Sequence, residues 1–199
     1  SQELANLVWA YSAAGYDAPF LYGAAAAAAA APEKLATFGP RDLANFAWVY
    51  ANVGFEAPDL FEALARESSS KMALFNARDL SNTAWAFSRA KMRPPGLFND
   101  IATEATKKAL TFDSQALASL AWAFAAAKFE APKLFEALAA EAAQKMASFA
   151  PQSIANTVWA FARQGIASQI LFDTVALEAP RKMAHFNSQD LANTAWAFS

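Results

Sequence analysis

The feature that most constrains this chain is a short aromatic pattern that recurs along its whole length. In each copy a tryptophan is followed by alanine or valine and then by phenylalanine or tyrosine, and the tryptophans stand at positions 9, 48, 85, 122, 159 and 196. The first interval is 39 residues and the next four are 37. A fixed period of this size is typical of stacked arrays, in which each repeat buries its apolar face against its neighbours. The sequence therefore predicts a repeat protein.

Each repeat predicts a helical hairpin. Its first helix begins at an N-cap such as Asn76, with Asp79 three residues on as the reciprocal partner. Other repeats carry the pair Asn187 and Asp190, or a proline at the first helical position after Gly39 or Ala150. The first helices are expected to end at Gly15, Gly54, Ala90, Ala127 and Gly165.

The second helix opens with proline in most repeats and carries an apolar stripe at helical spacing. The predicted fold class is therefore all-α: an α-solenoid of tandem 37-residue helical hairpins. We expect residues 1–199 to form a single array of five hairpins plus one terminal helix, about eleven helices in all. By analogy with known arrays the superhelix is expected to be right-handed. Because the chain opens and stops within a repeat, we expect it to be a fragment of a longer protein.

The first repeat departs from this pattern at eight consecutive alanines, residues 24–31, which precede Pro32. Proline in this place is expected to break or kink a helix. The alanines are either a low-complexity insertion or positions where alanine stands for another, unassigned side chain. No functional inference is drawn from them.

Composition excludes several classes of function. The 16 basic and 18 acidic residues give a net charge of −2, so the chain as a whole has no attraction for nucleic acid or an anionic membrane. There is no cysteine, and the one histidine, His185, belongs to no repeated constellation, so no metal site is expected. No membrane-spanning segment or targeting peptide is visible. No catalytic motif, cofactor or small-molecule substrate is indicated, and we expect a protein that is not an enzyme.

One face of the first helices is a candidate binding surface, because it combines a nearly constant polar column with two variable ones. The constant column is Asn6, Asn45, Asn82, Ser119, Asn156 and Asn193. One variable column reads Glu3, Asp42, Asp79, Ala116, Ser153 and Asp190, and the other reads Leu7, Phe46, Thr83, Leu120, Thr157 and Thr194. Helical-repeat RNA readers recognise one base with two or three side chains per repeat.

We therefore expect RNA to be contacted by a set drawn from these columns: Asp42, Asn45, Phe46, Asp79, Asn82, Thr83, Ser119, Asn156, Thr157, Asp190, Asn193 and Thr194. The alternative is that the asparagines bond a neighbouring backbone and that the variation is neutral.

Two further columns are open to a structural or a functional interpretation. The tryptophans could stack on bases, but their constant position next to alanine columns favours a place in the core. A lysine column (Lys34, Lys71, Lys108, Lys145 and Lys182) could bind phosphates. Glutamates four residues earlier, at positions 67, 104, 141 and 178, favour ordinary surface ion pairs instead.

The repeated core from Phe75 through Asp79, Leu80 and Asn82 to Trp85, Ala86 and Phe87 resembles the heptatricopeptide repeat family, a class close to the octotricopeptide repeats. The resemblance covers the whole chain, although Ala116 and Ser153 replace the aspartate and Ser119 replaces an asparagine. It implies an organellar RNA-binding protein of the mitochondrion, or alternatively the plastid. The implied partners are RNA, with rRNA the first candidate, and neighbouring proteins of a ribonucleoprotein, which could be a mitochondrial ribosome. The alternative function is a protein–protein interaction scaffold in a large assembly.

Overall fold

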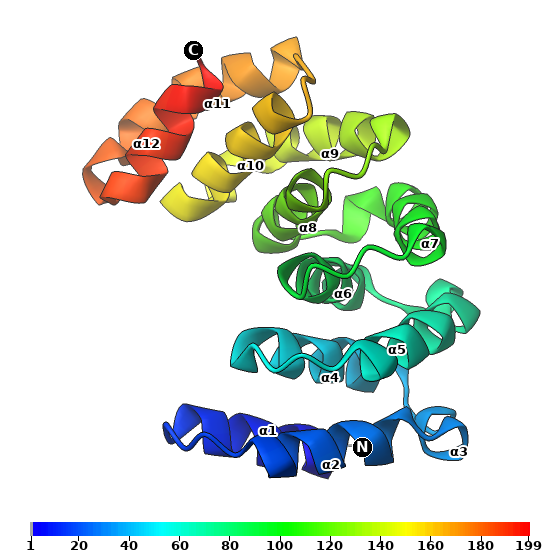
Figure 1. Cartoon of the computed structure of the whole chain (residues 1–199). Helices are drawn as coiled ribbons and strands as arrows, with labels where there is room; N and C mark the ends of the chain where they lie inside the picture. Colours follow the sequence, from blue (N-terminus) through cyan, green and yellow to red (C-terminus); the bar gives the residue numbers. More distant parts are fainter. Residues whose placement is uncertain (1) are drawn as a thin grey trace. The chain divides into compact units, whose positions relative to one another are not determined.

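The structure of the chain is a computed structural model that describes residues 2–199 (Figure 1). Within that range it contains twelve α-helices, four short 3₁₀ segments and no strand, so the predicted all-α solenoid class is confirmed. The helices are α1 (Gln2–Ala13), α2 (Pro19–Ala30), α3 (Pro32–Leu35), α4 (Pro40–Val53), α5 (Pro58–Ser70), α6 (Ala77–Arg89), α7 (Pro95–Lys107), α8 (Ser114–Ala127), α9 (Pro132–Lys145), α10 (Pro151–Arg163), α11 (Gln169–Lys182) and α12 (Ser188–Ala197). The 3₁₀ segments are η1 (Met72–Leu74), η2 (Ala109–Thr111), η3 (Met146–Ser148) and η4 (Met183–His185).

The chain divides into two compact units, the first ending at Ile101 and the second beginning at Ala102. In the first unit α4 packs between α1 and α6, while α2 and α5 form a second layer. In the second unit α10 packs between α8 and α12, with α9 and α11 as the second layer. Each unit is therefore a two-layer stack in which first helices contact first helices and second helices contact second helices.

Local sequence explains where the first helices begin. The Asn76 side chain accepts a hydrogen bond from the Asp79 backbone N–H (2.9 Å), and the Asp79 carboxylate accepts one from the Asn76 N–H (3.2 Å). The same reciprocal pair joins Asn187 and Asp190 at the start of α12. These contacts confirm the predicted caps and satisfy backbone donors that have no partner inside a helix. Asp113 caps α8 by accepting the Ala116 N–H, without the reciprocal bond, and the sequence pattern did not assign this role.

One residue just after each first helix, α12 excepted, lies in the left-handed region. Three of these residues are Gly15, Gly54 and Gly165, with φ of 73°, 72° and 68°. The predicted ends at Ala90 and Ala127 are confirmed, since Ala90 is the C-cap of α6 and α8 ends at Ala127. The left-handed residue follows one position later, at Lys91 (φ 59°) and Lys128 (φ 54°). A side chain with a Cβ is disfavoured in this conformation, so glycine was the residue that sequence reasoning looked for.

Phenylalanines and alanines form the core. The phenylalanine that precedes each first-helix cap is buried, at positions 38, 75, 112, 149 and 186. Ring pairs join the two layers, as between Phe61 and Phe87 (5.1 Å between centroids) and between Phe135 and Phe161 (5.0 Å). Alanines 44, 47 and 51 are buried on α4, and their small size lets neighbouring first helices approach closely, as expected.

The first repeat breaks where the sequence predicts. Helix α2 ends at Ala30 and α3 begins at Pro32, because proline lacks the N–H that would continue the hydrogen-bond ladder. None of the helices within residues 2–199 is both long and apolar enough to cross a bilayer.

Candidate nucleic-acid interface

A continuous stripe of solvent-facing residues runs along each first helix at spacings i, i+4, i+7 and i+11, which place side chains on one face. On α6 it consists of Arg78, Asn82, Trp85 and Arg89, of which the arginines are exposed and the other two half-buried. We call the equivalent positions the first-helix stripe. It continues as Arg41, Asn45, Trp48 and Asn52 on α4, Gln115, Ser119, Trp122 and Ala126 on α8, Gln152, Asn156, Trp159 and Arg163 on α10, and Gln189, Asn193 and Trp196 on α12.

The tryptophans of the stripe form a row at the surface. In the first unit the rings of Trp48 and Trp85 lie 6.4 Å apart. In the second unit Trp159 lies 6.4 Å from Trp122 and 6.5 Å from Trp196. The expectation that the tryptophans belong to the core is wrong, because none of the six is buried, and Trp9 and Trp196 are about half exposed (52% and 48%).

The asparagine column lies beside this row. Asn45, Asn82, Asn156 and Asn193 are half-buried, and within residues 2–199 their side-chain amides form no hydrogen bond to protein. The alternative in which these asparagines bond a neighbouring repeat's backbone is therefore not what the structure has. Each amide offers donors and an acceptor to a ligand at the surface.

The aspartate column has a structural role. The carboxylates of Asp42, Asp79 and Asp190 accept the backbone N–H of the residue three positions earlier, at 3.1–3.2 Å. Asp79 and Asp190 are buried, and burial raises the pKa of Asp79, while the Asn76 N–H and the positive charges of Arg41 and Arg78 act in the opposite direction. These carboxylates hold helix starts and are poorly placed to meet an anionic ligand.

The second variable column lies mostly in the interior, which corrects its predicted role. Phe46, Thr83 and Thr157 are buried, with exposed fractions of 0%, 0% and 2%. Thr194 is half-buried, and its hydroxyl donates to the Asp190 carbonyl at 2.8 Å. The structure brings the asparagine column to the surface and removes Phe46, Thr83 and Thr157 from reach of a surface ligand. The sequence analysis did not single out the arginines of the stripe. They stand four residues before or seven residues after the asparagine of the same helix, a spacing that places both on one face.

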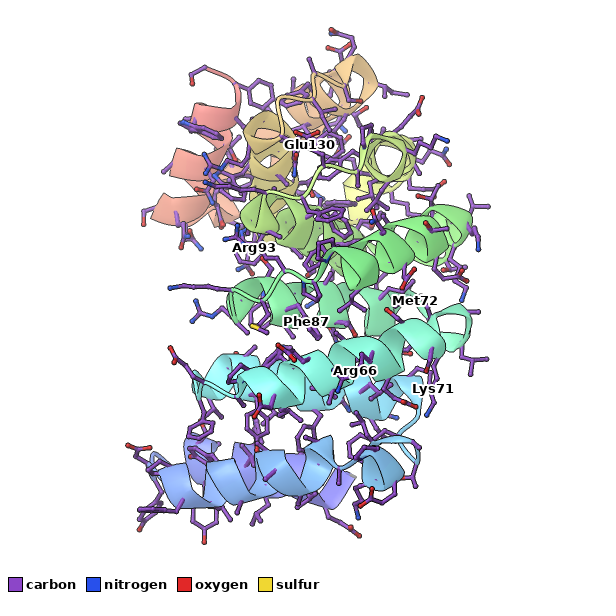
Figure 2. All side chains as sticks on the ribbon, turned by 45° about the vertical axis from the view of Figure 1, so that its right-hand side comes forward. Arg66, Lys71, Met72, Phe87, Arg93 and Glu130 are labelled. Atoms are coloured by element: carbon purple, nitrogen blue, oxygen red, sulfur yellow. The ribbon has the colours of Figure 1, made fainter. Side chains whose placement is uncertain are left out.

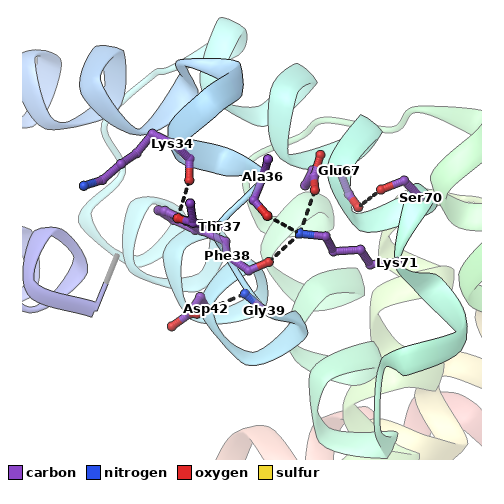
Figure 3. A network of polar contacts seen from close by, with 9 residues as sticks. All are labelled: Lys34, Ala36, Thr37, Phe38, Gly39, Asp42, Glu67, Ser70 and Lys71. Carbon is purple, nitrogen blue, oxygen red and sulfur yellow. Dashed lines mark hydrogen bonds and ion pairs between the residues drawn. The ribbon is translucent and has the colours of Figure 1, made fainter.

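The lysine column joins consecutive repeats. In the first unit the Lys71 ammonium donates to the carbonyls of Ala36 and Phe38 (both 2.8 Å) and pairs with Glu67 at 2.7 Å (Figure 3). Lys71 thus ties the end of α5 to the turn that precedes α4.

The second unit repeats this contact twice. Lys145 donates to the carbonyls of Leu110 and Phe112 (both 2.9 Å) and pairs with Glu141 at 3.0 Å. Lys182 donates to the carbonyls of Ala147 and Phe149 (both 2.7 Å). The predicted ion pairs with the glutamate four residues earlier are present for Lys71 and Lys145, whereas Glu178 pairs with Arg181 instead of Lys182. The carbonyl acceptors were not predicted. An ammonium that already has these partners is a poor phosphate ligand.

A sequence model of the family described as RNA-editing substrate-binding complex 6 protein (RESC6) matches residues 1–199. The chain belongs to this family. No curated protein matches the chain. Membership associates this RESC6-family protein with RNA editing, which agrees with the prediction of an RNA-associated helical protein. It does not point specifically to the heptatricopeptide repeats.

Charge is segregated between the two layers of this RESC6-family protein. On the first-helix stripe the charged residues are all basic: Arg41, Arg78, Arg89 and Arg163. Apart from Glu3 on α1, the acids of the first helices are the three capping aspartates. The second helices α5, α7, α9 and α11 carry nine acids and six bases, several of them paired, so their layer is acidic. The net charge of −2 therefore hides a basic stripe.

Metal binding gains no support from this surface. No cluster of three or more histidine, cysteine, aspartate or glutamate residues with the geometry of a metal site occurs within residues 2–199. His185 is exposed on η4, away from the stripe positions.

Proposed function

We propose that this chain binds single-stranded RNA within an RNA-editing substrate-binding complex, and that the first-helix stripe makes the contact. The family description supports the setting, since it names such a complex. The observation that carries the proposal is the set of half-buried amides of Asn45, Asn82, Asn156 and Asn193, which form no hydrogen bond to the described residues, next to a row of tryptophans that reach the surface.

The three kinds of residue on the stripe suit different parts of a nucleotide. Amides can pair with base edges, as in other helical-repeat readers of RNA. The exposed edges of the indoles add apolar and aromatic contact to bases. Arginines attract phosphates, and their charge would make affinity fall as salt rises.

The finer parts of the prediction remain proposals. We propose a mitochondrial location, and the heptatricopeptide class as the relative of the array, on the strength of the 37-residue period. Contact with rRNA in a mitochondrial ribosome is a weaker candidate than RNA editing, because the family description gives it no support. A lack of enzymatic activity is also a proposal, resting on the absence of a catalytic motif in the sequence.

A protein-scaffold function is the second candidate. The word "complex" in the family description favours it, as does the mixed charge of the second helices, which presents both signs to a protein partner. Salt separates the two functions: RNA binding through phosphates must weaken steeply as salt rises, and no RNA affinity at low salt would favour the scaffold.

The test replaces three asparagines of the stripe together: Asn45→Ala, Asn82→Ala and Asn156→Ala. Each lost amide contact is worth ~1 kcal/mol, so RNA affinity should fall on the order of a hundredfold. The melting temperature should hardly change, because these amides form no hydrogen bond to the protein. Gln144→Ala, at an exposed position of α9, is the control and should leave affinity unchanged. A lower melting temperature with unaltered affinity would assign the asparagines to architecture.

A further inference from the structure

The turn between α6 and α7 carries a cluster of positive charge. Arg89, Lys91 and Arg93 are exposed, and none of them forms an ion pair with an acid of residues 2–199. Arg89 and Lys91 also line a groove of about 420 Å³ in the first unit, together with one acid, Glu56. The three side chains therefore form a positively charged edge at the end of the stripe.

The equivalent turns of the other repeats carry at most one basic residue at these three positions, although all follow the same helix position. The residues that correspond to Arg93 are Asp17, Glu56, Glu130 and Ala167. Figure 2 labels Arg93 and Glu130, the basic and acidic versions of this position. The residues that correspond to Arg89 are Ala13, Asn52, Ala126 and Arg163. Only the α6–α7 turn is basic at all three positions, so the charge does not follow from the repeat architecture.

The backbone at Lys91 adds an independent observation. Its φ of 59° lies in the left-handed region, where Gly15, Gly54 and Gly165 stand in three equivalent turns and Lys128 (φ 54°) stands in the fourth. Lysine is less favourable than glycine in that conformation. The fold would be served better by glycine at both lysines, but only Lys91 stands between two further basic residues, whereas Lys128 stands between Ala126 and Glu130.

We propose that the α6–α7 turn, through Arg89, Lys91 and Arg93, binds the phosphate backbone of single-stranded RNA. This inference rests on the proposed function and adds to it the position of the RNA phosphate backbone on the protein. Arginine suits this task because its guanidinium offers a planar set of donors, and lysine contributes a compact point charge.

The experiment measures the affinity for a fluorescein-labelled oligouridylate at several salt concentrations. The variant combines Arg89→Gln, Lys91→Gly and Arg93→Gln. Loss of three phosphate contacts should lower the slope of log affinity against log salt by about 2, since each contact contributes roughly 0.7 for a single strand.

A matched control removes the same charge from the second-helix side. It combines Lys34→Gln, Arg66→Gln and Lys133→Gln, all at exposed positions. The salt slope of this control should remain that of the unchanged chain. An equal fall in both variants, or no fall in the turn variant, would overturn the inference while leaving the proposed function intact.

The single variant Lys91→Gly separates a ligand contact from a structural role. It should raise the melting temperature by about 2–4 °C, because glycine relieves the left-handed backbone, and it should lower the salt slope by about 0.7. A lower melting temperature with an unchanged slope would assign Lys91 to the C-terminal end of α6. If the unchanged chain binds polyglutamate and not the oligouridylate, the turn meets an acidic protein, and both proposals fail.

Discussion

The Asn82 amide and the Thr83 hydroxyl are adjacent in sequence and lie in opposite environments. Asn82 is half-buried at the surface, whereas Thr83 is completely buried and its hydroxyl finds no hydrogen-bond partner. A step of one residue rotates a side chain by 100° around the helix, enough to pass from solvent to core. Helical periodicity alone placed both residues on the binding face. It could not locate the edge of the buried face, because that edge depends on how closely the neighbouring helices pack.

Thr83→Val should therefore stabilise the chain without affecting RNA. Valine has nearly the same shape, and it removes a buried hydroxyl that forms no hydrogen bond, so the free energy of unfolding should rise by about 1 kcal/mol. Calorimetry gives the stability and RNA titration gives the affinity. Weaker RNA binding by this variant would restore Thr83 to the interface.

Glu104 provides a test of pH dependence. Hydrogen bonds from Lys108 and Lys107 lower the pKa of this carboxyl below its ordinary value of 4.5. Since the pKa is lower in the folded chain, the carboxylate stabilises the fold at higher pH, and that contribution is lost as pH falls through the lowered pKa. Glu104→Gln should be less stable than the unchanged chain by about 1 kcal/mol at neutral pH.

The difference between the two proteins should shrink as the pH falls below 4.5, the ordinary value for this group. Thermal melts of both proteins at a series of pH values measure it. A stability difference that stays constant through the acid range would contradict the assigned ion pairs.

At the level of helices, one lysine at the end of each of α5, α9 and α11 fixes the register between consecutive repeats. These lysines are Lys71, Lys145 and Lys182. Each ammonium reaches carbonyls 33 to 36 residues earlier in the chain. The sequence predicted the intrahelical glutamate partner of Lys71 and Lys145, because that pair depends only on i,i+4 spacing, although Glu178 pairs with Arg181 instead of Lys182. It could not predict the carbonyls, since their position depends on how one hairpin packs against the next.

Lys145→Met should weaken the second unit. The change removes two charge-assisted hydrogen bonds to Leu110 and Phe112 and leaves the buried Glu141 without its partner. The expected loss is about 2 kcal/mol of unfolding free energy, discounted because the lysine is partly exposed. Lys133→Met, at an exposed position of α9, is the control and should change stability little.

Circular dichroism during thermal unfolding compares the two variants. Equal melting temperatures would mean that the carbonyl contacts of Lys145 contribute nothing measurable to the packing of one repeat on the next.

For the molecule as a whole, the 37-residue period was sufficient to predict hairpins, their caps and the all-α solenoid class. The exposure of the tryptophans could not be predicted, because a large aromatic residue at a constant position usually indicates a core. The tryptophan row lies between the alanine residues that contact neighbouring helices and the solvent. The packing of the helices sets the position of that boundary. Seven of the twelve predicted site residues lie half-buried at the surface, among them the four asparagines, whereas Phe46, Asp79, Thr83, Thr157 and Asp190 are buried.

The intrinsic fluorescence of the chain during titration with single-stranded RNA tests the central claim most directly. All six tryptophans occupy the same repeat position, so the signal reports only on the first-helix stripe. Binding to the stripe should quench the fluorescence to a plateau, and added salt should reverse the quenching. The anisotropy of a labelled strand measures RNA binding in parallel. If RNA binds and tryptophan fluorescence stays unchanged, the claim that the first-helix stripe is the RNA interface is contradicted.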